Sequence, residues 1–418
     1  MSSPENVPVA APPLDLSKWR NVPNWLLIGG GVLAATGFFV NHRQFCYSWL
    51  QAFMFFLSLF LGGFFIVLVH HLFDASWTVP IRRFCEHITS LAPLMALLFI
   101  PILLNVFVAG PGTIIYQWMV ENPHADHALH SKLPLFTKSG FVIVTVFCFA
   151  VWWLLSEKLR SWSLEQDQTG SVESTLAMRR WSYYGIFLFA ITLSLAASMW
   201  MKALQHQWFS TMYGVYYFAG SIWTSLATFY LITAVLDRQG ALRQVVHEDT
   251  YYFLGSLLLA FTVFYAYIHF AQYFIIWNAN MPEETFWYKV RERGTWWDVG
   301  MIIVFGHFFV PFLALLRIDV KVSSLMYPIC IWAWLMHYFD LSFNIMPVAN
   351  PAGFPGNWLW LDLGCLAFMA GLLGKAFLKQ LKAHPAYPVN DPRLAESLGV
   401  YVAPAVAPRT VTEQEGPK

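Results

Sequence analysis

Long apolar runs alternate with short polar segments along most of the chain. A helix of about 20 apolar residues crosses the hydrocarbon core of a bilayer. Ten runs have or approach that length, and they cover residues 25–40, 45–71, 87–108, 140–156, 182–204, 215–236, 250–277, 299–316, 324–346 and 358–380. The pattern predicts an all-α integral membrane protein with ten transmembrane helices, in a membrane domain over residues 21–383.

The first run and the two ends of the chain depart from this pattern. Gly29, Gly30 and Gly31 interrupt the first run, and glycine weakens an isolated helix. We therefore expect close packing on a neighbouring helix to hold this span. Residues 1–20 and 384–418 are rich in Pro and Ala, and we predict that both segments are disordered.

A weak internal repeat relates the second to fifth predicted helices to the sixth to ninth. Cys85-Glu-His87 opens the third helix, much as His247-Glu-Asp249 precedes the seventh. Parallel repeats of this kind occur in membrane transport proteins. We predict two four-helix bundles, at about residues 45–204 and 215–346, flanked by the first and tenth helices.

The composition supports a membrane protein and limits its cofactors. Only 12% of the residues are charged, whereas soluble domains have about 25%. The net charge of +1 gives no indication of nucleic-acid binding. The cysteines form neither a CxxC pair nor a CxxCH motif; they are Cys46, Cys85, Cys148, Cys330 and Cys365. This spacing excludes covalent c-type haem and argues against an iron–sulfur cluster on this chain, while a b-type haem, a quinone or a partner's cofactor stays open.

Lys and Arg are distributed unequally between the predicted loops. Ten spans place both termini on one side, and 18 of the 25 Lys and Arg residues fall on that side. The other side carries Arg43, Lys132, Lys138, Lys202, Lys289, Arg291 and Arg293. Because cytoplasmic loops are enriched in basic residues, we expect both termini in the cytoplasm.

Four ionisable side chains fall at similar depth within the apolar runs of the second bundle. They are His269, His307, His337 and Asp340. Ionisable groups inside a membrane commonly mark a pathway, and histidine titrates near neutral pH. We interpret these four residues as an outer proton half-path.

A second polar group lies at the predicted cytoplasmic edge of the first bundle. Its members are His70, His71, Asp74, Glu86 and His87. A histidine beside a carboxylate can pass protons on, so we interpret this group as an inner proton half-path. Charged residues are also ordinary at helix ends, and the polar groups of both half-paths could serve only to hydrogen-bond helices together.

Other interpretations stay open. His269, Gln272 and Tyr273 share one helical face and could bind a quinone, paired histidines could bind a b haem, and the chain could be a purely structural membrane anchor. One loop contains three spaced histidines without cysteine or a defined carboxylate geometry, so we expect no metal site. These histidines are His124, His127 and His130.

Four segments resemble one known family. They cover residues 49–58, 67–72, 77–83 and 271–285, and the last reads Ala-Gln-Tyr-Phe-Ile-Ile-Trp-Asn-Ala-Asn-Met-Pro-Glu-Glu-Thr. These segments resemble ActF, the second NrfD-like (polysulfide-reductase-type) membrane subunit of bacterial alternative complex III. The resemblance covers roughly residues 45–380, and segment 271–285 is its most specific part.

The resemblance implies a ten-helix subunit of the bacterial inner (cytoplasmic) membrane that binds no cofactor and has no complete active site. It implies a complex that oxidises menaquinol and reduces cytochrome c or a terminal oxidase. The implied partners are a sister NrfD-like subunit, a periplasmic iron–sulfur protein, multihaem and monohaem c-type cytochromes, and lipid. Haem c and iron–sulfur clusters would belong to the partners, and this chain would translocate protons.

Overall fold

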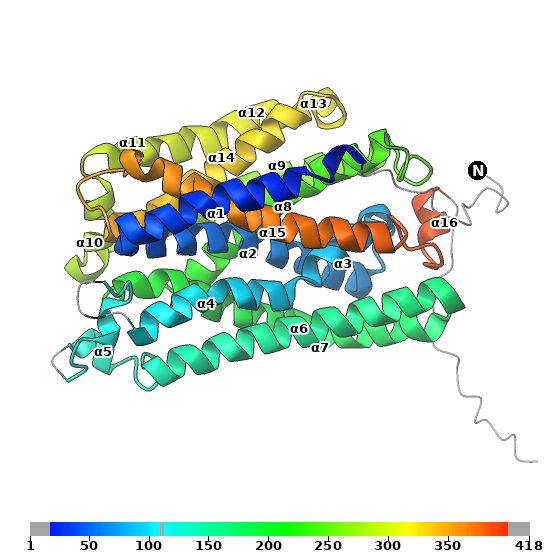
Figure 1. Cartoon of the computed structure of the whole chain (residues 1–418). Coiled ribbons are helices and arrows are strands. Elements are labelled where there is room, and N and C mark those ends of the chain that lie inside the picture. Colours follow the sequence, from blue (N-terminus) through cyan, green and yellow to red (C-terminus); the bar gives the residue numbers. More distant parts are fainter. Residues whose placement is uncertain (1–16, 109, 111–112, 125, 400–418) are drawn as a thin grey trace, which may run out of the picture.

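Long helices lying side by side form the molecule (Figure 1). The structure is a computed structural model that describes residues 17–108, 110, 113–124 and 126–399, and all regular secondary structure among these residues is helical. Helices α5 (His127–His130) and α10 (Pro282–Arg291) lie at one end of the bundle, and α16 (Leu394–Ser397) lies at the other. The all-α prediction is confirmed. Residues 1–16 and 400–418, which belong to the segments predicted to be disordered, lie outside the described residues.

Eight helices in the described part of the chain are long and apolar enough to cross a membrane. They are α1 (Val22–Val40), α2 (His42–Phe73), α6 (Lys138–Thr169), α7 with its continuation (Val172–Gln205), α8 (Tyr213–Arg238), α9 (Glu248–Ala279), α11 to α12 (Thr295–Leu315) and α15 with the turn before it (Gly356–Ala383). These helices indicate an integral membrane protein. The ninth predicted run forms α14 (Met326–Ile345), which is not one of the eight; its polar residues lower its mean hydropathy.

The third predicted helix is divided. Helices α3 (Val79–Thr89) and α4 (Ala92–Val108) meet at a bend of 41°, and together they could form a ninth span. Pro93, the second residue of α4, has no N–H to donate, and its ring clashes with the carbonyl one turn earlier. Glu86 and His87 therefore lie in the last turns of α3, not at the start of a straight span.

Helices α2 and α8 form the buried centre of the bundle and pack against each other. A Cβ atom on Gly62 of α2 would overlap the side chain of Ser225 on α8. Ser225 donates a hydrogen bond to the backbone oxygen of Ser58 at 3.0 Å. The two halves of the chain are thus joined by a contact that is both close-packed and polar.

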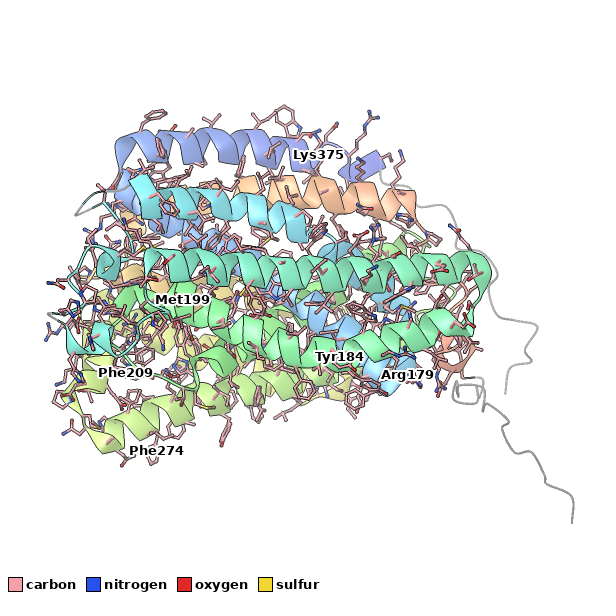
Figure 2. The ribbon with its side chains drawn as sticks, turned by 90° about the horizontal axis from the view of Figure 1, so that it is seen from below. Arg179, Tyr184, Met199, Phe209, Phe274 and Lys375 are labelled. Carbon is pink, nitrogen blue, oxygen red and sulfur yellow. The ribbon has the colours of Figure 1, made fainter. Side chains whose placement is uncertain are left out.

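The periphery differs from this centre in the side chains that it exposes. Phe274 of α9 is 48% exposed and lies at the rim of the bundle in Figure 2. Arg179 and Lys375 lie toward the end that carries α16 (Figure 2). An apolar rim with charges toward one end is typical of a protein surrounded by lipid or by other membrane subunits.

Helix α1 packs along α15 through its glycines. A Cβ atom on Gly30 would overlap the backbone nitrogen of Phe368 and lie 2.7 Å from the carbonyl oxygen of Gly364. A Cβ atom on Gly29 would meet nothing within 4 Å. The expectation that a neighbouring helix holds this glycine-rich span by close packing is confirmed.

Residues 384–399 differ from the predicted disordered tail. Tyr387 is fully buried, Leu394 is 2% exposed and Asp391 is 6% exposed, and α16 packs against α3. Composition indicated disorder because Pro and Ala recur throughout residues 384–418. A few apolar anchors and one buried ion pair are enough to fix it to the helices.

Gly30→Ala should destabilise the protein, because the added methyl group must push α1 away from the backbone of α15. Overpacking of this kind costs about 1–3 kcal/mol. Gly29→Ala is the matched control, since it removes a helix penalty of about 1 kcal/mol without meeting an obstacle. We expect the melting temperature of the purified protein in detergent to fall for Gly30→Ala alone. Equal melting temperatures for the two variants would mean that the α1–α15 contact does not stabilise the fold.

Candidate functional site

The carboxylate of Asp340 on α14 lies in a buried cluster of hydroxyl groups. Its Oδ1 atom accepts a hydrogen bond from Tyr265 of α9 at 2.7 Å and a short one from Tyr216 of α8. Asn344, one turn further along α14, donates to the Tyr216 hydroxyl at 2.9 Å and accepts from Tyr213 at 3.0 Å. Three helices thus surround one carboxylate that is 2% exposed. We call this region the outer polar cluster: Tyr213, Tyr216, Tyr265, His269, His307, His337, Asp340 and Asn344.

Within this cluster, two of the predicted histidines contact Tyr265. The Nδ1 atom of His269 lies 3.4 Å from the Tyr265 hydroxyl, which is a long hydrogen bond. The ring of His307 is stacked between Tyr265 and Trp223, with 3.7 Å between ring centres on each side. Tyr265 therefore links His269 to Asp340 by hydrogen bonds and touches His307 by its ring face.

His337 lies on the same face of α14 as Asp340, but its hydrogen-bond partner is on α2. Its Nε2 atom lies 2.9 Å from the Ser58 hydroxyl on α2, and Ser58 also contacts the Tyr217 hydroxyl on α8 at 3.2 Å. Gly220 of α8 faces both groups, since a Cβ atom there would lie 3.6 Å from Oδ2 of Asp340 and 3.6 Å from Cε1 of His337. The structure thus brings all four predicted outer residues into one buried region.

The local fold around His307 is unusual. This residue lies in a π-helical segment, Ile303–Phe309, between α11 (Thr295–Ile302) and α12 (Val310–Leu315). Pro311 cannot donate the usual hydrogen bond to the carbonyl of His307, four residues earlier. π-Helical turns are rare and often occur at functional sites.

Several buried polar atoms near Asp340 have no hydrogen-bond partner among the described residues. They are both ring nitrogens of His307 and Nδ1 of His337. Buried polar groups nearly always have partners, and internal water supplies those that the protein lacks. The outer polar cluster therefore offers binding positions for internal water beside a buried carboxylate.

The predicted inner residues form an ion-pair network around α3. Glu86 lies 3.0 Å from Nε of Arg82 and 3.0 Å from Nη1 of Arg83, and Ser163 of α6 donates to it at 3.0 Å. Arg82 and Arg83 are 1% and 0% exposed. We call this region the inner polar cluster: His70, His71, Asp74, Arg82, Arg83, Glu86 and His87.

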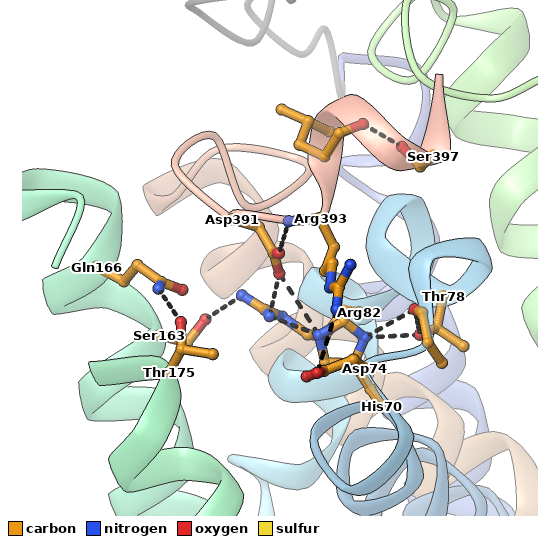
Figure 3. Close-up of polar contacts among 12 residues, drawn as sticks. His70, Asp74, Thr78, Arg82, Ser163, Gln166, Thr175, Asp391, Arg393 and Ser397 are labelled. Carbon is orange, nitrogen blue, oxygen red and sulfur yellow. Dashed lines mark hydrogen bonds and ion pairs between the residues drawn. The ribbon is translucent and has the colours of Figure 1, made fainter. Parts of the chain in front are cut away.

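The C-terminal segment completes the inner polar cluster. Figure 3 shows Asp391 and Arg393 on this segment above Arg82, His70 and Asp74. Asp391 pairs with Arg82, whose Nη1 atom also lies 2.8 Å from Nε2 of His70. Burial alone would raise the pKa of Asp391, but Arg82 and the hydrogen bond from His70 outweigh it and hold this pKa below its usual range. The ion pair is therefore fully formed at neutral pH and is lost only in strongly acidic solution.

Asp74 forms ion pairs, whereas His71 and His87 are buried histidines without an ionic partner in the part of the chain that the structure describes. Asp74 at the end of α2 pairs with Arg179 and, at 3.3 Å, with Arg393. Nε2 of His71 and both ring nitrogens of His87 are buried without a hydrogen-bond partner among the described residues. The inner carboxylates are thus fixed by arginines, whereas these two histidines have ring nitrogens available to water.

A cavity of about 470 Å³ lies beside the outer polar cluster, between α9 and the segment from α10 to α12. Its walls are mainly aromatic and aliphatic, and they include His269, Tyr273 and Tyr288. Gln272 bonds to the Tyr288 hydroxyl at 3.2 Å and to Ser210 at 3.1 Å and does not line the cavity. Of the three residues predicted to bind a quinone, two reach the cavity.

Arg291 at the end of α10 is a buried cation with no carboxylate in ion-pair range among the described residues. It donates to the backbone oxygens of Phe343 and Asn344 at 2.7 and 3.0 Å and to Gln205 at 3.0 Å. Burial lowers the pKa of Arg291 to about 9. The guanidinium caps the end of α14 and also lines the cavity, where its charge favours an electron-rich ligand atom.

Several of these residues were not among the predicted site residues. Tyr265 lies four residues before His269 on one helix face, and that spacing could have identified it. Arg82 and Asp391 are 309 residues apart, so no local pattern relates them. Asp362 is a second buried carboxylate within an apolar run, bonded to Tyr338 at 2.7 Å, and its position in the run was a usable signal.

Comparison with family models and with curated proteins identifies no relative. The chain matches no protein-family model, and no curated protein gives a significant match. The chemistry of the two polar clusters therefore rests on their residues and geometry.

Asp391→Asn should loosen the C-terminal segment, because the amide leaves Arg82 without its ionic partner on that segment. Breaking a buried ion pair by removing one partner costs about 3–5 kcal/mol. Cys85 is fully buried beside Glu86, so its alkylation by a water-soluble maleimide, measured by mass spectrometry, should become faster. Glu396→Gln is the control, since Glu396 is partly exposed where it pairs with Arg393. Equal labelling of Cys85 in both variants would contradict a closing role for this segment.

Proposed function

We propose that this chain is a cofactor-free membrane subunit of a bacterial respiratory quinol:acceptor oxidoreductase, similar to ActF of alternative complex III, and that it carries protons across the inner membrane. The observation that carries the proton role is the buried Asp340 carboxylate, which accepts hydrogen bonds from two tyrosines and lies beside two buried histidines and the half-buried His269. A carboxylate among hydroxyl and imidazole groups can take up a proton and release it.

The two polar clusters supply the two steps of such a pathway. Ring nitrogens of His71, His87 and His307 have no hydrogen-bond partner among the described residues. Internal water would bond at these positions, and water can relay a proton between side chains that do not touch. An apolar cavity of about 180 Å³ is lined by residues of α2, α3, α4, α8 and α15, and none of its lining residues belongs to either cluster. A dry apolar gap blocks protons until it is wetted, so a conformational change in the complex would control transfer.

All ten predicted runs span the membrane in this proposal, with α3 and α4 as the third span and α14 as the ninth. Contacts of α2 with α4 and α7, and of α4 with α6, support a first four-helix bundle. Contacts of α8 with α9 and α14, and of α11 with α14, support a second. The bias of Lys and Arg supports cytoplasmic termini. The periplasmic iron–sulfur protein and the c-type cytochromes would then bind toward the end that carries α5 and α10, and the sister membrane subunit would pack against the apolar rim.

A quinone-binding role is the second candidate, and the cavity beside His269 favours it. Ligand cavities are mostly apolar, with a few polar groups that set orientation. The aromatic walls would hold the ring, while His269 and Arg291 would face its oxygen atoms. The same complex could use this cavity for menaquinol, whose oxidation releases protons close to Asp340.

Asp340→Asn preserves size but removes the group that binds a proton. We expect the assembled complex in proteoliposomes to oxidise quinol while proton translocation is lost. Asp362→Asn is the matched control, because it removes another buried carboxylate that lies outside both clusters. Co-purification with haem-containing partners and the visible haem spectrum report assembly. A complex with Asp340→Asn that assembles and translocates protons like the wild type would refute the role of Asp340.

His269→Ala tests the quinone candidate by its effect on quinol binding, because His269 also belongs to the outer polar cluster. Loss of the imidazole should raise the KM for quinol by about tenfold, which corresponds to one lost hydrogen bond of about 1.4 kcal/mol. It should also reduce the quinone that co-purifies, as measured by mass spectrometry. Tyr267→Phe is the control, because Tyr267 lies on the same helix but is 65% exposed. Unchanged KM and unchanged quinone content would exclude this cavity as the quinone site.

A further inference from the structure

Two loops at the end of the bundle that carries α5 bring an imidazole and two carboxylates together. Nε2 of His206, which follows the continuation of α7, lies 2.7 Å from Oδ2 of Asp126 and 3.2 Å from Oε2 of Glu121. The three atoms all lie within 4.8 Å of one another. We propose that Glu121, Asp126 and His206 bind a divalent transition-metal ion of the zinc class, which joins the two loops.

The local structure arranges two of the three ligands in advance. Oδ1 of Asp126 accepts hydrogen bonds from the backbone N–H groups of Ala128 and Leu129 at 2.8 and 3.2 Å and so caps α5. This leaves Oδ2 for His206, whose side chain is only 6% exposed. The hydrogen bond from His206 lowers the pKa of Asp126. The carboxylate is therefore ionised at neutral pH, as a metal ligand must be.

The distances are close to those of a tetrahedral site. Bonds of about 2.0–2.2 Å to zinc place two ligand atoms about 3.3–3.6 Å apart. His206 and Glu121 are already near this separation, and Asp126 must move away from His206 by about 0.6 Å. Glu121 is 41% exposed, so water can supply the fourth ligand. The nitrogen ligand favours the zinc class over Mg²⁺ or Ca²⁺, which prefer oxygen ligands.

A proton competes with the metal for the same position. Protonated His206 would bridge the two carboxylates by charge alone. Lys132 donates to the backbone oxygen of His206, and its positive charge weakens the binding of any cation nearby. Burial, together with Lys202, lowers the pKa of Lys132 to about 8. Because a metal ligand must be deprotonated, a metal ion and a proton on Nε2 of His206 exclude each other.

The sequence pattern pointed to other residues in the same loop. His124 and His130 lie with their ring centres 5.7 Å apart and are not part of the three-residue group. The nitrogen ligand comes instead from His206, 80 residues after Asp126. The expectation of no metal site rested on three histidines of one loop, whereas the ligand set spans two loops.

Zinc titration of the EDTA-treated protein, together with the partners that co-purify with it, tests the site. Calorimetry near neutral pH should show one saturable site, which Asp126→Asn, Glu121→Gln and His206→Ala each weaken by at least about tenfold. Asp126→Asn keeps the capping oxygen of α5, so loss of folding cannot explain its effect. Bound Co²⁺ should give the strong visible absorption of a tetrahedral site.

His130→Ala is the control for non-specific binding by loop histidines and should leave the affinity unchanged. The proposal is overturned if the wild type shows no saturable zinc site, or if Asp126→Asn and His206→Ala bind zinc as tightly as the wild type. Either result would leave His206 as a polar link between the two loops, next to Asp126 and Glu121. Neither result would bear on the proton pathway, because none of these residues belongs to the two polar clusters.

Discussion

Polar and charged side chains buried among apolar helices must satisfy one another, because neither lipid nor apolar side chains can hydrogen-bond to them. This constraint is met differently in the two polar clusters. In the inner cluster, arginines surround the carboxylates, and each ion pair holds its neighbours in place. In the outer cluster, Asp340 accepts hydrogen bonds from neutral hydroxyl and amide groups. A carboxylate held by neutral donors can gain or lose a proton without breaking an ion pair.

The backbone packing makes these polar contacts possible. Gly62 lets α2 approach α8, and this approach places Ser58 between His337 and Tyr217. Because Gly220 has no side chain, Asp340 and His337 both pack against the same turn of α8. Small residues at helix contacts are the usual means of close approach in membranes. In this chain they also determine which polar side chains meet.

Asp391 shows how far apart in sequence the members of a buried network can be. Its segment reads as a polar, Pro-rich tail, and an acidic residue in such a tail normally stays in water. Docking is favourable because Arg82 is already buried beside Glu86 and lacks full compensation until Asp391 arrives. The cost of an unpaired buried charge thus explains why a short terminal segment packs against α3.

The sequence by itself determined that the chain is helical and apolar enough for a membrane, where the long helices lie, and which of their residues are polar within apolar runs. These properties depend on composition and local spacing, which hydropathy and helical periodicity report directly. The break before Pro93 was not predicted, because the run 87–108 contains both Pro93 and Pro101 and the helix continues through the second. Only the tertiary structure decided that Tyr216 and Tyr265 bond to Asp340 and that Asp391 reaches Arg82. It also decided that His269 and Tyr273 of α9 line a cavity while Gln272 bonds to Tyr288. Those outcomes depend on how helices distant in sequence are rotated against one another, and many rotations bury nearly the same apolar area, so local pattern cannot choose among them.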